Sequence, residues 1–483
     1  MPGDYSHFET IRWGQKPFIL VYIDPENVSA GRDGSTPEKA LTAFPYDLRC
    51  PLIGDESSSF ENISEDVMVD TKVYGICYIV KHTDRTTKPA RLYQTIDKTA
   101  TPTLYHRTDT YPLKNIMIIG CPCPTDELFS IFPSHIKESA DWCLRGWDPV
   151  SKTITDKTYE YANIQANHGT DTNYNVNHYY PVVGVHDQRF STFVMNRCFV
   201  YRKAVNKHHA PIFEFIGRQN NKNAWNYNTK VAVNIQNCKF GYQAADELFW
   251  DFDDPNWNTP ITDCEYSTGF IYCSETNQLV IKNVIVNATT FANRTSLYNR
   301  NNAGGRYPYE MSPHDNNNSC ARYLYDSFDS SFGKYHGINF SYVVHAQLHN
   351  ITVNQMTTKA TARHNTSSNT DDYGYETGKT QHVIRIGSAI SSDSSGTYNM
   401  QNTNVEVVNF AVKYIFNKPD NDIQSLTPTF YLGTFDYTRV RNVTAEFQKD
   451  EHGDLVVAGG GDPSRLMLVH ILMLFKSIHS IIM

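Results

Sequence analysis

Short apolar segments recur along the chain, and six of them carry an asparagine at the same place in the pattern. An apolar residue stands two positions before the asparagine, and apolar residues or a cysteine stand one and three positions after it. The segments are LKNIMI, IQNCKF, IKNVIV, LHNITV, VVNFAV and VRNVTA, around Asn115, Asn237, Asn283, Asn350, Asn409 and Asn442. We interpret the shared apolar positions as inward-facing.

The alternation of these segments changes phase at the asparagine. In a straight strand, an inward residue two positions before the asparagine would place the asparagine inward and the next residue outward. Here the next residue is apolar instead, which predicts a corner in the backbone. Asparagine is one of the few residues that accept the left-handed conformation of such a corner. Stacked corners would align the asparagines into a hydrogen-bonded ladder.

A seventh segment, VMNRCF, fits this frame less well. Centred on Asn196, it puts Arg197 at an inward position. We interpret it as a further layer of the same structure with a local bulge.

A second family of apolar strands lies between these segments, and polar stretches separate the strands. Its members are Pro211–Gly217, Gly269–Ser274, His382–Gly387 and Thr429–Gly433. The polar stretches are rich in Asn, Ser, Thr and Gly, which is typical of lateral loops. Together the two families predict an all-β fold, a right-handed parallel β-helix. A β-sandwich is the alternative, but it does not explain a phase change at the same residue type.

The opening of the chain supports the same fold through a resemblance. Val21–Leu41 reads VYIDPENVSAGRDGSTPEKAL, an apolar strand followed by an Asp- and Gly-rich turn. Thr36 before Pro37 and Glu38 is a favourable helix start. This stretch resembles the opening of many pectate-lyase-like β-helix proteins, through Asp24, Gly31, Asp33, Gly34, Ser35, Thr36, Pro37 and Glu38. Its expected role is to cap the first layer of the solenoid.

We therefore divide the chain into three parts: an N-terminal strand and capping helix over 1–45, the β-helix over 46–458, and an apolar C-terminal segment over 459–483. Insertions are predicted at about 121–180, 243–265, 291–334 and 357–381. The last residues, Leu466–Met483, are almost wholly apolar, with Lys476 interrupting them. We expect an oligomer contact there. A membrane anchor, or an end created by a frame change, are the alternatives.

Charge and composition narrow the partners. The net charge is −8 and no Lys/Arg cluster is present that would follow a phosphate backbone, so nucleic acid is not expected.

The N-terminus has neither a basic region nor an apolar one, so we expect synthesis in a cytoplasm without a signal peptide. The ten cysteines form no C-x-x-C pairs, which predicts reduced, mostly buried thiols.

Within the pectate-lyase-like superfamily, this Asn- and Tyr-rich chain with long loops looks most like bacteriophage tailspikes and other virion β-helix proteins. The resemblance implies a homotrimer in a virus particle, with other virion proteins and host surface polysaccharide as partners. We therefore expect a virion structural protein that binds host glycan. A polysaccharide hydrolase or lyase on the same fold is the alternative, and a bacterial surface adhesin is a third reading.

Catalysis of glycan cleavage would require two carboxylates flanking the bond. The insertion Asp246–Glu265 supplies candidates in Asp251, Asp253 and Asp254, with Trp250 and Trp257 as faces for a sugar ring. A solvated acidic loop is the structural alternative. Glu214 is a second candidate, because it points outward if its neighbours Phe213 and Phe215 point inward. We expect neither a bound metal nor a cofactor, since the glycine and distant glutamate of a calcium loop are missing.

Overall fold

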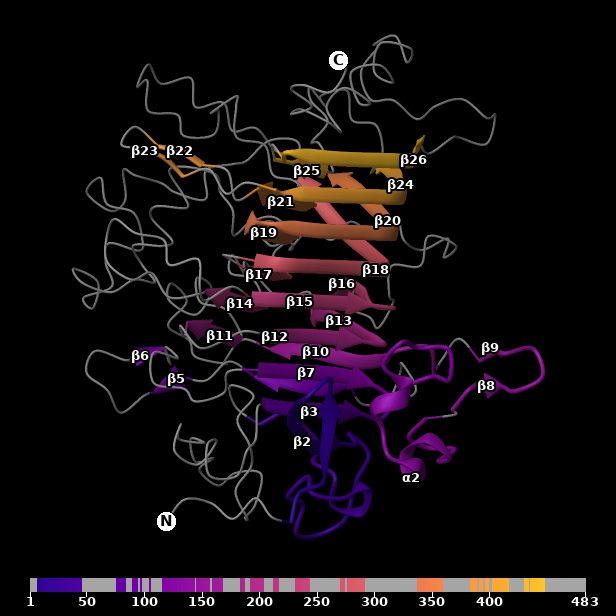
Figure 1. Ribbon diagram of the computed structural model, residues 1–483. Helices are drawn as coiled ribbons and strands as arrows, with labels where there is room; N and C mark the ends of the chain where they lie inside the picture. The colour runs from indigo at the N-terminus through magenta and orange to yellow at the C-terminus, as the bar shows by residue number, and fades with distance from the viewer. Residues whose placement is uncertain are drawn as a thin grey trace, which may run out of the picture.

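The computed structural model shows an all-β protein whose strands lie one above another along one axis (Figure 1). The structure describes residues 7–45, 75–83, 89–93, 96–97, 104–105, 115–143, 145–156, 159–167, 183–186, 192–203, 212–216, 231–243, 270–273, 276–291, 337–358, 383–388, 391–393, 396–398, 402–416, 430–433 and 435–447.

The strands form three parallel stacks, in which each strand pairs with the strands of the layers before and after it. The first stack comprises β2 (Lys16–Ile23), β3 (Gly75–Val80), β7 (Asn115–Gly120), β12 (Thr192–Asn196), β15 (Val231–Gln236) and the first parts of β18 (Thr276–Phe291), β20 (His345–Thr358), β24 (Asn404–Phe416) and β26 (Tyr437–Phe447). The second stack comprises β4 (Ala90–Tyr93), β10 (Ala162–Asn167), β13 (Cys198–Lys203), β16 (Lys239–Gln243) and the later parts of the same long strands.

The third stack is a separate sheet. It comprises β11 (Val183–His186), β14 (Phe213–Ile216), β17 (Ile271–Cys273), β19 (Ile338–Val343), β21 (Ile384–Ser388) and β25 (Phe430–Leu432). The four predicted wall strands fall on β14, β17, β21 and β25, so this prediction is confirmed. β11 and β19 belong to the same sheet and were not predicted.

Five asparagines occupy the corner between the first and second stacks. Asn237, Asn283, Asn350, Asn409 and Asn442 all have a positive φ, between 51° and 57°. The side-chain amide of each donates to the side-chain oxygen of the asparagine one layer before it, at 2.8–2.9 Å, from Asn442 back to Asn237. The amide of Asn237 donates in turn to Asn196 and to Asp126. The ladder therefore begins on a carboxylate, which can only accept.

Two expectations about this ladder are wrong. Asn115 is not a corner: it begins β7 and pairs with Thr192, five residues before the corner of that layer. Ile116 and Ile118 do face the core, but simple alternation in a straight strand places them there. In the VMNRCF segment the corner is Arg197 (φ 55°), not Asn196. With Arg197 in the corner position, Met195, Cys198 and Val200 take the inward places of the common frame without a bulge.

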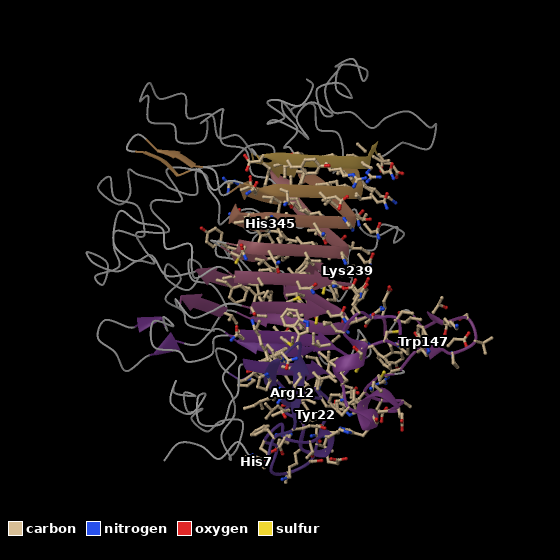
Figure 2. The ribbon with its side chains drawn as sticks, in the orientation of Figure 1. His7, Arg12, Tyr22, Trp147, Lys239 and His345 are labelled. Atoms are coloured by element: carbon tan, nitrogen blue, oxygen red, sulfur yellow. The ribbon has the colours of Figure 1, made fainter. Side chains whose placement is uncertain are left out.

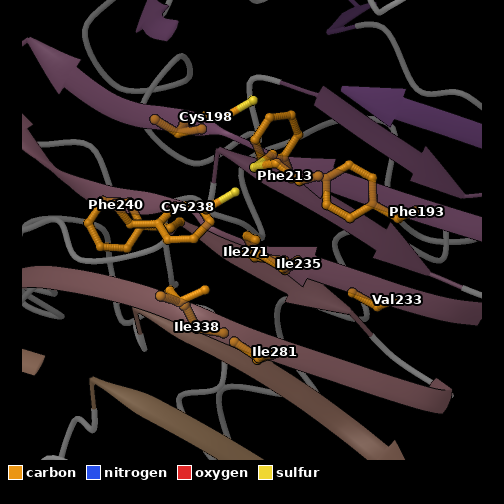
Figure 3. Close-up of a cluster of buried hydrophobic side chains, with 14 of the residues drawn as sticks. Phe193, Cys198, Phe213, Val233, Ile235, Cys238, Phe240, Ile271, Ile281 and Ile338 are labelled. Atoms are coloured by element: carbon orange, nitrogen blue, oxygen red, sulfur yellow. The ribbon is translucent and has the colours of Figure 1, made fainter. Parts of the chain in front are cut away.

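The three stacks enclose one continuous apolar core. Figure 3 shows part of it, with Phe193 and Val233 of the first stack, Phe240 of the second and Ile271 of the third. Inward residues are fully buried through β24, where Val407 and Val412 are at most 1% exposed. On β26 the corresponding Val440, Val443 and Ala445 are only partly buried. The core is therefore less covered at its C-terminal end.

The N-terminal end of the stack is covered by the opening segment. β1 (Thr10–Trp13) pairs antiparallel with β2 and so occupies the edge that would otherwise begin the sheet. The expected capping helix is a single 3₁₀ turn, η1 (Pro37–Lys39), whose N-cap Thr36 accepts a hydrogen bond from the Lys39 amide. Buried Asp33 holds the preceding turn through Ser35.

A second apolar cluster lies outside the first layers, where an insertion covers the outer face of β2, β3, β7 and β12. This insertion contains η4 (Phe129–Ile131), α2 (Ser134–Lys137) and the hairpin of β8 (Trp147–Asp148) and β9 (Thr153–Ile154). Tyr22 meets Trp142 edge to face there, with ring centroids 5.1 Å apart. The predicted insertion at about 121–180 also contains β10, which is a strand of the second stack.

Two further hairpins complete the described structure: β5 (Ile96–Asp97) with β6 (Leu104–Tyr105), and β22 (Ser391–Asp393) with β23 (Gly396–Tyr398). Most of the other predicted insertions, and the whole C-terminal segment from 459, lie outside the described residues.

In the part of the chain that is described, no helix is both long and apolar enough to cross a membrane. The seven cysteines described are buried, as predicted.

Candidate functional site

The residues expected to carry catalysis are mostly outside the described structure. Asp251, Asp253, Asp254, Trp250 and Trp257 all lie there.

Glu214 lies on β14, between Phe213 and Phe215, and both phenylalanines are buried in the core as the prediction requires. Its backbone pairs with Gly184 and Tyr272 on the adjacent strands. The outward positions of the next two layers, Tyr272 and Asn339, are only 4% and 0% exposed. The outward face of the third stack is therefore covered at these positions of β17 and β19.

Among the described residues, a surface of mostly polar, exposed or half-exposed side chains lies on the first stack, before the asparagine corner. Along β18, β20, β24 and β26, residues one, three and five positions before each corner asparagine alternate with the buried ones. Parallel pairing in register aligns them into three columns. We call this surface the polar face. It comprises Gln278, Val280, Lys282, His345, Gln347, His349, Asn404, Glu406, Val408, Tyr437, Arg439 and Arg441.

At the C-terminal end of the polar face, one carboxylate is surrounded by three nitrogen-bearing side chains. Glu406 lies 3.1 Å from the guanidinium of Arg439, 3.9 Å from that of Arg441 and 3.4 Å from Nε2 of His349. Both arginine side chains are close to half exposed, at 45% and 49%. The cluster therefore carries at least one positive charge in excess, in a position that solvent reaches.

Beside this cluster the polar face presents an aromatic ring. Tyr437 is 61% exposed and is two residues before Arg439 on the same side of β26. In register with it is Asn404, whose amide lies 2.8 Å from Nδ1 of His345 on the next strand. Figure 2 shows His345 on the upper layers of the stack. Exposed aromatic, amide and guanidinium groups are side chains that bind sugar rings and hydroxyls.

At its other end, the polar face meets the insertion that covers the first layers. Glu127 accepts hydrogen bonds from Gln236 at 2.8 Å and from Lys282 at 2.9 Å. These two contacts, that from Gln236 foremost, lower the pKa of Glu127. This end of the face is thus tied to the insertion, and its carboxylate is held ionised.

Sequence reasoning missed the polar face because it followed the inward positions. The outward positions were available in the same frames, LVIKN, AQLHN, VEVVN and TRVRN. The residue immediately before each asparagine gives one column, Lys282, His349, Val408 and Arg441, and the residue three positions before it gives the next, Val280, Gln347, Glu406 and Arg439.

The buried titratable groups near the insertion are structural. His82 is buried and donates from Nδ1 to the carbonyl of Tyr159, while its Nε2 has no hydrogen-bond partner among the described atoms. Burial lowers the pKa of His82 to about 3, so the ring is neutral. Burial likewise raises the pKa of the Cys121 and Cys143 thiols to about 12, which makes them poor nucleophiles. Within the described ranges, no three His, Cys, Asp or Glu residues are placed to bind a metal ion.

No family model, curated protein or solved structure matches this chain.

Proposed function

We propose that the three stacks are the walls of a right-handed parallel β-helix of the pectate-lyase-like kind. The layer order supports this: the chain passes through β14, then β15, the corner at Asn237 and β16, and reaches the next layer at β17. Parallel pairing of every stack and the asparagine corners are consistent with a solenoid. The opening motif around Asp33 and Pro37 supports the same assignment.

On this scaffold we propose a virion structural protein that attaches the particle to host surface glycan, in the manner of a tailspike. The observation that carries the proposal is the polar face: a row of exposed and half-exposed polar side chains and one exposed tyrosine, on paired strands whose inward residues are fully buried from β18 through β24 and partly buried on β26. A site on rigid, packed strands needs little ordering on binding, which favours the weak individual contacts of sugar recognition.

Self-association is part of this proposal. The half-buried Val440, Val443 and Ala445 leave apolar surface at the C-terminal end of the core. Such surface favours contact with another copy, and the resemblance to tailspikes implies a homotrimer.

The experiment that tests attachment uses the full chain and intact host cells. Candidate hosts are mixed with labelled protein before and after periodate oxidation, which destroys sugar rings but leaves surface proteins. We expect binding that periodate abolishes and that Tyr437→Ala weakens, while Lys413→Gln, an exposed change on the other side of the corner, leaves it intact. Binding that survives periodate would contradict attachment through glycan. Release of new reducing ends from the extracted polysaccharide would instead support the hydrolase or lyase alternative.

A further inference from the structure

We propose that the C-terminal end of the polar face is a subsite for an acidic sugar, in which Tyr437 contacts the ring and Arg439 and Arg441 bind its carboxylate. The inference rests on the proposed function, because it specifies the chemical class of glycan that the polar face would bind.

The charge balance around Glu406 is the first argument. Two guanidinium groups lie within 4 Å of a single carboxylate, and the closer contact, from Arg439, is 3.1 Å. Each guanidinium has five N–H donors in a planar fork that matches a carboxylate. One glutamate cannot occupy the donors of both. A second carboxylate, brought by a ligand, would complete the set and neutralise the excess charge.

His349 does not compete with the arginines for Glu406. Its Nε2 approaches Glu406 to 3.4 Å but makes no hydrogen bond with the described part of the chain. The imidazole therefore leaves the carboxylate of Glu406 to the arginines.

The placement of Tyr437 is the second argument. Residues two apart on a strand are roughly 7 Å apart on the same face. That separation places the ring of Tyr437 beside the guanidinium of Arg439, about the reach of one sugar unit with its acidic group. The ring is 61% exposed, whereas Tyr22, Tyr78 and Tyr201 are buried. An exposed ring next to an exposed charge suits a ligand that is apolar on one face and anionic at its edge.

The neighbouring strand supplies a polar group for the hydroxyls. Asn404 on β24 lies in register with Tyr437 and is exposed. Adjacent strands are about 4.8 Å apart, so the amide of Asn404 is within reach of a ring held on Tyr437. The subsite thus combines a ring platform, a hydroxyl partner and a carboxylate partner.

The test compares acidic sugars with their neutral counterparts. Saturation-transfer NMR on the full chain would be recorded with methyl glucuronide against methyl glucoside, and with methyl galacturonide against methyl galactoside. In both pairs the acid has a carboxylate where its neutral counterpart has a hydroxymethyl group. We expect the acid to bind at least tenfold more tightly in at least one pair, an increase that high salt reduces.

Variants locate the subsite. We expect Arg439→Gln to remove the preference for the acid and Tyr437→Ala to remove binding of the whole ring, while Lys413→Gln, which deletes an exposed cation beyond the corner, changes neither. Acids that bind no better than their neutral counterparts in both pairs, an unchanged preference in Arg439→Gln, or no binding of any of the four sugars would each overturn the inference. If the chain binds a host polysaccharide that has no carboxylates, the attachment function stands and the acidic-sugar subsite is wrong. If the chain binds acidic sugars selectively but is absent from virus particles, the subsite stands and the attachment function is wrong.

Discussion

Asp126 accepts hydrogen bonds from both Nε and Nη2 of Arg197, at 3.0 and 2.6 Å, at the one described corner of the ladder that is not an asparagine. The pair is buried, with side-chain exposures of 1% and 12%. Asp126 also accepts from the amides of Asn196 and Asn237 and from the backbone of Cys123. The carboxylate of Asp126 therefore connects the insertion to the start of the asparagine ladder.

We expect Asp126→Asn to lower the free energy of unfolding by about 3–5 kcal/mol, because it leaves the Arg197 guanidinium buried without a counter-charge. Arg197→Asn restores the residue type of the other corners but leaves Asp126 with fewer donors. In the double variant neither charge remains, so its loss should be smaller than the sum of the single losses. Urea unfolding of the four proteins measures this coupling, and strictly additive losses would contradict it.

The ladder makes a separate prediction at Asn350, which donates to Asn283 and accepts from Asn409. Asn350→Gly should lose mainly these hydrogen bonds, about 1 kcal/mol for each. Asn350→Ala should lose about 1 kcal/mol more, because alanine is strained at a φ of 56°. Thermal unfolding distinguishes the two, and equal stability of both variants would show that the corner conformation carries no cost.

His82 predicts how stability depends on pH. Its pKa is lowered from the ordinary value of 6.5 to about 3 in the folded protein, by burial above all. Below pH 6.5 the unfolded chain binds a proton that the folded chain does not, so the stability due to neutral His82 is complete above pH 6.5 and is lost as pH falls toward 3. Between pH 6.5 and 5 this should amount to roughly 2 kcal/mol.

The measurement is urea unfolding at several pH values, in the parent chain and in His82→Gln. The pH dependence of the variant should be flatter by that amount. A variant as pH-sensitive as the parent would show that His82 is not the group responsible.

The C-terminal end of the core gives a prediction about assembly. Val412→Ala removes two methyl groups from a fully buried side chain and should cost about 1–3 kcal/mol, whereas Val443→Ala, one layer further, should cost less than half of that in the isolated chain. If other copies cover this end, as proposed, the cost of Val443→Ala should rise with protein concentration. A cost that does not change with concentration would count against self-association through Val443.

The sequence predicted the parts of this fold that depend on a repeated local rule. Asn237 and the four later corner asparagines could be placed because an apolar frame changes phase there, and β14 or β21 because their apolar runs end at glycine. Asn115 shows the limit of that rule, since an alternating strand reproduces half of the frame. Arg197 could not be recognised as a corner, because arginine is not a residue type that favours a positive φ and the carboxylate that binds its side chain, Asp126, is 71 residues away in the chain.

The candidate site was less predictable for a related reason. Glu406 is 31 residues before Tyr437 and 33 residues before Arg439 in the chain. It becomes their neighbour only through the register of β24 and β26. No motif of fixed spacing identifies them. The acidic insertion drew attention because its residues are contiguous, and Asp251, Asp253 and Asp254 remain predictions outside the described residues.

The central claim is that this chain is a parallel β-helix that assembles on a virus particle and presents its polar face to host glycan. Electron cryomicroscopy of the native particle, with the chain located by antibody labelling, tests it most directly. The account predicts three copies around one axis on the outside of the particle, each with layers about 4.8 Å apart and the polar face open to solvent. A chain that is absent from the particle, or one whose polar face is buried between copies, would contradict it.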